Sequence, residues 1–162
     1  MTTPTDIERI SYGGPVGSLQ LGAHRQIIQS VGATRALLAK ESGALCLFDR
    51  AAGNVYTLPT PVEGMQFDFL TTVAVTSNAA KVISQTIASE FMLGAVSSGE
   101  LAAAMDVFQA NGTTHVAISS NGSTTGGLIG SIIRLTALSS TIWGVFGVIV
   151  GSGTLADPFA TS

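Results

Sequence analysis

The chain has 162 residues, of which 46% are apolar, 10% are charged and 19 are glycine, and its formal net charge is −3. This length fits one domain with a sizeable core, and an acidic chain with few, scattered cations is not typical of nucleic-acid-binding proteins, which cluster lysine and arginine on one face. A surface with so little charge consists largely of small polar residues, so we expect it to be covered in part by further copies of the chain or by another protein.

Residues 1–30 are predicted to form an extended N-terminal arm, and residues 31–162 the folded domain. The arm contains Gly13-Gly14-Pro15, Gly17 and Gly22 and is poor in apolar periodicity. Such a segment does not form a core of its own, so it is either disordered or lies along a partner. At the start of the domain, residues 31–40 alternate in a way that fits either a strand or a short helix.

Residues 41–69 are predicted to contain three linked strands. Residues 44–48 are apolar on both alternating faces, as in a strand buried between two layers. Residues 55–58 form a second strand that ends at Pro59, because proline cannot donate a ladder hydrogen bond. In the third, Met65, Phe67 and Phe69 alternate with polar residues, which places three large side chains on one face.

The rest of the chain is predicted to continue as short strands joined by turns. They cover residues 73–76, 82–87, 91–96, 113–119, 129–137 and 141–150. Residues 101–108 fit a short helix or a strand, since Leu101, Met105 and Phe108 recur at helical spacing. Roughly eight to ten strands with turns every ~8–12 residues predict an all-β fold, namely an antiparallel β-sandwich or barrel.

A loop at residues 119–127 contains almost only Ser, Thr, Asn and Gly. Its side chains are small, and its glycines adopt positive φ without strain, so the backbone is able to approach another surface closely. We therefore expect Asn121, Gly122, Gly126 and Gly127 to form a close-contact loop.

No motif in the sequence predicts an enzyme or a cofactor site. Neither the Gly-x-Ser-x-Gly nucleophile motif nor the Gly-x-x-x-x-Gly-Lys-Ser/Thr phosphate loop is present. His24 and His115 are the only imidazoles, and we interpret His115 as an ordinary surface or interface side chain. We expect no catalytic residue and no cofactor.

Metal binding is not predicted either, because the chain has one cysteine and two histidines spread over distant positions. Cys46 lies in an apolar run and is expected to be a small buried hydrophobe. Asp49, Glu63 and Asp68 lie at or next to predicted turns, where solvated carboxylates are expected. The sequence also predicts no secretion signal and no membrane span, since residues 142–150 are far fewer than the ~20 apolar residues a helix needs to cross a bilayer.

Several short motifs resemble those of the decoration, or cement, proteins that coat the heads of tailed bacteriophages. An early group consists of Glu41-Ser42-Gly43, Tyr56-Thr57-Leu58-Pro59 with Pro61, and Gly64-Met65 with Phe67 and Phe69. A late group consists of Gly126-Gly127-Leu128-Ile129-Gly130, Trp143-Gly144-Val145, Gly151-Ser152-Gly153-Thr154 and Pro158-Phe159-Ala160. The resemblance extends from residue 31 onward.

This resemblance implies a β-sandwich of jelly-roll character that forms a homotrimer, binds the major capsid protein on the outer surface of the virion and stabilises the shell. Such a protein is made in the host cytoplasm, is not an enzyme and has neither nucleic acid nor membrane as a partner. On this interpretation Arg9, Arg25 and Arg35 contact the capsid. The alternative is a phage fibre or spike head module that binds a host-surface glycan through the 119–127 loop.

Overall fold

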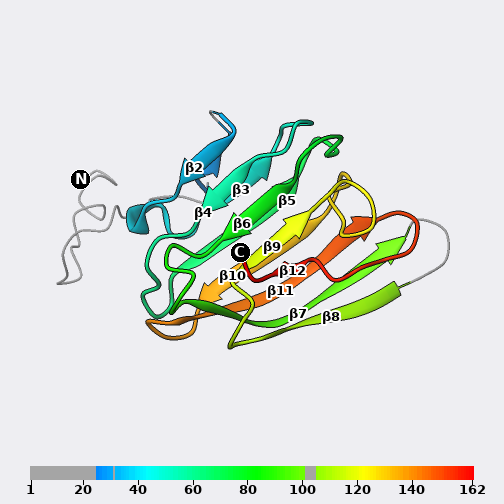
Figure 1. The fold of residues 1–162 in the computed structure, drawn as a ribbon. Coiled ribbons are helices and arrows are strands. Elements are labelled where there is room, and N and C mark those ends of the chain that lie inside the picture. Colours follow the sequence, from blue (N-terminus) through cyan, green and yellow to red (C-terminus); the bar gives the residue numbers. More distant parts are fainter. Residues whose placement is uncertain (1–24, 31, 101–104) are drawn as a thin grey trace, which may run out of the picture.

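A computed structural model describes residues 25–30, 32–100 and 105–162 (Figure 1). These residues form an all-β fold, with no α-helix among them and one short 3-10 turn, η2 (Ala39–Glu41). The strands are β1 (Ile27–Ile28), β2 (Thr34–Ala36), β3 (Leu45–Phe48), β4 (Val55–Thr57), β5 (Gln66–Thr71), β6 (Ala80–Ile83), β7 (Phe91–Glu100), β8 (Met105–Asn111), β9 (Ala117–Ser120), β10 (Ile132–Ala137), β11 (Ile142–Gly151) and β12 (Phe159–Ala160). The expectation of an all-β protein is confirmed.

The strands are arranged in two sheets that share one core. A seven-stranded sheet has the order β1-β3-β5-β10-β11-β7-β8, and a five-stranded sheet has the order β12-β9-β6-β4-β2. Aromatic rings join the two layers: the ring of Tyr56 on β4 lies 5.6 Å from that of Phe69 on β5 and 5.5 Å from that of Phe48 on β3. Phe67 and Trp143, both fully buried, pack 6.2 Å apart beside them.

In the first half of the chain, successive strands alternate between the two sheets. Strands β1, β3 and β5 lie side by side in the larger sheet, and β2, β4 and β6 lie side by side in the smaller one. Each of these neighbouring pairs is parallel, because every turn carries the chain across the core to the opposite sheet. The prediction of antiparallel sheets is therefore wrong: both sheets are mixed.

The second half of the chain supplies the antiparallel pairs and one long parallel pair. Two hairpins, β7–β8 and β10–β11, are antiparallel, and β7 also pairs in parallel with β11 over ten residue pairs. Strand β8 resolves part of the ambiguous 101–108 segment, since residues from Met105 onward are extended. Residues 73–76 do not form the predicted strand. Val75 is nevertheless buried, and its N–H donates to the carbonyl of Gly127.

The described part of the predicted arm belongs to the fold. Strand β1 pairs with β3, and Ile28 is 2% exposed in the core. Residues 1–24 lie outside the described residues, so the expected extended arm is described only from Arg25 onward. Residues 31–40 contain both of the predicted possibilities, strand β2 and the start of η2.

Candidate binding face

The side of the seven-stranded sheet that points away from the core carries two rows of side chains, and we call this side the outer face. The strand register defines each row, because residues that are paired across neighbouring strands point to the same side of the sheet. One row runs Val107, Ser97, Val148, Ile132, Leu70 and Leu47 from β8 to β3. The adjacent row runs Gln109, Ala95, Phe146, Arg134, Asp68, Leu45 and Ile27 from β8 to β1.

Large apolar side chains are concentrated on the outer face. Among the described residues, thirteen large apolar side chains are exposed, and seven of these lie on this face: Ile27, Leu93, Met105, Val107, Ile132, Phe146 and Val148. Phe146 is 71% exposed although it lies on β11, an interior strand of the sheet. Phe146, Val148 and Ile132 are close neighbours on β11 and β10, and clustered exposed apolar side chains are typical of interaction sites.

Three charged side chains form an ion cluster in the middle of this apolar surface. The Nε and Nη2 atoms of Arg134 donate to the two carboxylate oxygens of Asp68, at 2.8 and 3.0 Å. The Nη1 atom of Arg25 donates to the same carboxylate at 2.7 Å, and its other nitrogens donate to the carbonyls of Gly43 and Ala44. The Asp68 side chain is 5% exposed, whereas those of Arg25 and Arg134 are 44% and 57% exposed. Asp68 is therefore not the solvated acid predicted from the sequence.

The hydrogen bonds from Arg134 hold the pKa of Asp68 below its usual value. The hydrogen bond from Arg25 acts in the same direction, and the two arginines together outweigh the opposing effect of burial. A carboxylate that accepts several charged hydrogen bonds keeps its charge although it is covered. The cluster thus contains one negative and two positive charges, and it leaves one positive charge on the outer face.

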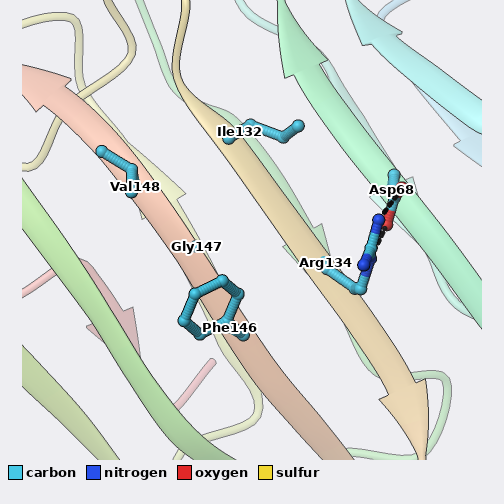
Figure 2. A pocket seen from close by; sticks show the side chains of 6 residues that line it. All are labelled: Asp68, Ile132, Arg134, Phe146, Gly147 and Val148. Carbon is cyan, nitrogen blue, oxygen red and sulfur yellow. Dashed lines mark hydrogen bonds and ion pairs between the residues drawn. The ribbon is translucent and has the colours of Figure 1, made fainter.

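A shallow pocket of about 140 Å³ lies next to the ion cluster. Its walls are formed by Asp68, Ile132, Arg134, Phe146, Gly147 and Val148. Figure 2 shows the Phe146 and Val148 side chains on β11, Ile132 and Arg134 on β10, and the Arg134 guanidinium beside Asp68 on β5. One wall is therefore the Arg134–Asp68 ion pair, and the other side chains that line the pocket are apolar.

The arginines predicted to contact a capsid lie in different parts of the molecule. Arg9 falls outside the described residues, and Arg25 belongs to the ion cluster. Arg35, on β2 of the other sheet, donates to Glu41 of η2 at 2.7 Å, and Glu41 also accepts from the N–H of Leu38. The structure thus places Arg25 on the outer face and Arg35 in a local ion pair; their contact with a capsid stays a prediction.

The 119–127 loop is held together by its own polar groups. The side-chain oxygen of Asn121 accepts from the N–H groups of Ser123 and Thr125, and its amide donates to Thr124. The close approach made by Gly122, where φ is +84°, is to the carbonyl of Val75, which a Cβ atom would meet at 1.9 Å. Gly126 and Gly127 likewise have positive φ. Contact of this loop with another surface stays a prediction.

Three other side chains with reactive or titratable groups contact neighbouring parts of the fold: Cys46, His115 and Asp49. Cys46 is fully buried on β3, as predicted, and burial raises the pKa of its thiol to about 12. His115 stacks on Phe159 with ring centroids 5.6 Å apart, and its Nδ1 accepts from the N–H of Asn111. Asp49 accepts from the backbone N–H and the hydroxyl of Ser30.

No group of three or more His, Cys, Asp or Glu side chains in residues 25–30, 32–100 and 105–162 is arranged to hold a metal ion. In the same part of the chain, no helix is long and apolar enough to cross a membrane.

Arg134 is the site residue that the sequence analysis missed. It is a single charge in the apolar strand from Ile132 to Leu135, as Asp68 is between Phe67 and Phe69. A lone charge on the outward side of an apolar strand is a signal that another charge lies opposite it. The sequence does not reveal which strand supplies the partner, because β5 and β10 are more than 60 residues apart.

No protein-family model matches the chain, and neither the curated proteins nor the solved structures contain a match to it.

Proposed function

We propose that the protein is a capsid decoration protein of a tailed bacteriophage, which binds the outer surface of the head as a homotrimer and stabilises the shell without catalysis. The outer face carries this proposal, because exposed apolar side chains grouped on one face are typical of a protein that acts by contact. The motif resemblance from residue 31 onward supplies the class of partner, the major capsid protein.

In this proposal the two packed sheets are a β-sandwich. The antiparallel pairs β7–β8, β10–β11 and β6–β9 support the proposed jelly-roll character. The parallel pairs among β1 to β6 depart from an antiparallel jelly roll.

The stabilisation follows from binding linkage. A trimer that bridges shell subunits binds the assembled lattice and not the free subunits, so each occupied site favours the intact shell by RT ln(1 + [L]/Kd). This amounts to about 4 kcal/mol when the free concentration exceeds Kd a thousandfold. The effect is multiplied over many sites and requires no reactive group.

Two measurements test the proposal. Light scattering of the purified protein is expected to give three times the 16.5 kDa of one chain, and a monomer at micromolar concentration would contradict the trimer. Heads with and without bound protein are then heated side by side, with DNA release as the readout. Decorated heads are expected to release DNA at a higher temperature. Equal release temperatures with the protein bound would reject the stabilising role and favour receptor binding.

A further inference from the structure

The pocket at the centre of the outer face combines a fixed guanidinium with apolar walls. Asp68 holds Nε and Nη2 of Arg134, so this side chain is oriented before any partner arrives. Among the hydrogen bonds of the described residues, none uses Nη1 of Arg134, and the side chain is 57% exposed. A planar guanidinium with a remaining donor edge matches the geometry of a carboxylate.

The charge of the surroundings favours an anion. Arg25 and Arg134 share the single carboxylate of Asp68, so the cluster retains one unit of positive charge on an apolar surface. Partial exclusion of water by Phe146, Ile132 and Val148 strengthens the attraction for a negative group. A second copy stacked on the same face would instead bring two positive clusters together, and such a contact between like charges is unfavourable.

We propose that this pocket binds the carboxylate of an Asp or Glu side chain that a partner protein presents within an apolar surface. The carboxylate pairs with Arg134, and the apolar neighbours of the acid pack on Phe146, Ile132 and Val148. The identification of that partner as the capsid shell rests on the proposed function; the chemistry of the site does not.

The preorganised arginine and its aromatic neighbour explain why we expect this pocket to contribute most of the binding energy toward a partner protein. Ordering a free arginine on binding has an entropic cost, which is reduced here because Asp68 already fixes the side chain. Arginine and large aromatic side chains are enriched at binding hot spots. Phe146 and Arg134 are direct cross-strand neighbours on β11 and β10, so they form such a pair.

The test uses the full-length chain and a small probe, isovalerate, whose carboxylate and branched tail imitate the proposed group. Isovaleramide has the same shape without the charge. In a nuclear magnetic resonance titration, we expect saturable shifts of the Arg134 Nε–H and Phe146 ring signals with isovalerate, and at least tenfold weaker binding of isovaleramide. Equal binding of the two probes, or no saturation with isovalerate, would overturn the proposal.

Variants separate the guanidinium from general charge effects. Arg134→Gln is expected to weaken isovalerate binding about tenfold or more, and Arg134→Lys, which keeps the charge but not the fork, to weaken it less. Lys81→Gln removes one positive charge from β6 of the other sheet and should leave binding unchanged. An equal loss with Lys81→Gln would show a nonspecific charge effect and reject the site. Circular dichroism checks that each variant is folded.

Two alternative occupants of the pocket, residues 1–24 of the same chain and a second copy of the chain, predict different results. Either result would overturn the proposal. If residues 1–24 of the same chain fill the pocket, isovalerate binds only after their deletion. If a second copy fills it, Arg134→Glu dissociates the oligomer measured by light scattering.

Head binding separates this inference from the proposed function. If Arg134→Glu binds heads as tightly as the wild type does, the decoration role stands and the carboxylate site is wrong as its contact. If the wild type does not bind heads but binds isovalerate selectively, the decoration role fails and the site stands.

Discussion

The carboxylate of Asp68 and the guanidinium of Arg134 face each other across β5 and β10 and are joined by two hydrogen bonds of 2.8 and 3.0 Å. Paired geometry of this kind is stronger than a single contact between exposed charges. It also covers Asp68, and removing the Asp68 carboxylate would leave two neighbouring arginines without the partner they share. The pair therefore contributes to the stability of the sheet as well as to the candidate binding site.

The first prediction concerns acid stability and the variant Asp68→Asn. The folded state lowers the pKa of Asp68 below 3.8, so its stabilising effect is complete above pH 3.8. Below this pH the unfolded chain takes up the proton first, and the effect is lost as the pH falls toward the lower pKa of the folded state. Asp68→Asn should thus be less stable than the wild type at neutral pH, and the difference should narrow below pH 3.8.

Urea denaturation at a series of pH values measures this difference. Asp106→Asn is the matched control, because it removes an exposed carboxylate from the edge strand β8. A constant gap between wild type and Asp68→Asn down to pH 2 would show that the ion cluster does not contribute to acid stability.

The strands were largely predictable from the sequence, whereas the way they are connected was not. A continuous apolar run located β3, and a proline set the end of β4. Alternation located β5, and the burial of Met65, Phe67 and Phe69 confirms that pattern. A turn at Gly53 or Gly64, however, has the same sequence signature in a hairpin and in a crossing to the opposite sheet. A hairpin and a crossing differ in which strand the next strand pairs with. The residues of the turn do not specify that partner.

The candidate site was only partly predictable for a related reason. The sequence singles out Arg25 as a cation, but it predicts a solvated acid beside a turn for its partner Asp68. Burial of Asp68 results from two arginines that arrive from β10 and from the segment before β1. Only the long-range register of the sheet brings the three together.

The second prediction concerns backbone packing at Gly122. Gly122 and Gly43 both have positive φ, +84° and +91°, so a Cβ atom causes similar backbone strain at each, about 1–2 kcal/mol. At Gly122 the Cβ would also collide with the Val75 carbonyl, whereas at Gly43 nothing lies within 4 Å. Gly122→Ala is therefore expected to lower the free energy of unfolding by about 1–3 kcal/mol more than Gly43→Ala does. Equal denaturation midpoints and slopes for the two variants would contradict this.

The third prediction compares the contributions of β1 and of residues 1–24 to the stability of the fold. Deletion of residues 1–30 removes Ile28, which is 2% exposed in the core, and should destabilise the fold. Ile28→Ala alone is expected to cost about 2–5 kcal/mol, because it creates a cavity under the edge of the seven-stranded sheet. Deletion of residues 1–24 leaves β1 and the Arg25–Asp68 pair in place and serves as the comparison. Thermal unfolding of the deletions and of Ile28→Ala measures both effects, and a full-strength transition after deletion of 1–30 would show that β1 is dispensable.

The fourth prediction uses Cys46 to report on opening of the core. Its thiol is fully buried on β3, and burial raises its pKa to about 12. The thiolate is the reactive form, so at pH 8 only about one thiol in ten thousand is ionised even before access is considered. Reaction with a disulfide reagent should hence be limited by opening of the fold, with one thiol per chain reacting at once in guanidinium. Ile28→Ala, which weakens the strand next to β3, should accelerate the reaction in native buffer, whereas Arg134→Lys, on the outer surface, should change it far less. Labelling of the native wild type at the rate of an exposed thiol would show that the core around β3 opens readily.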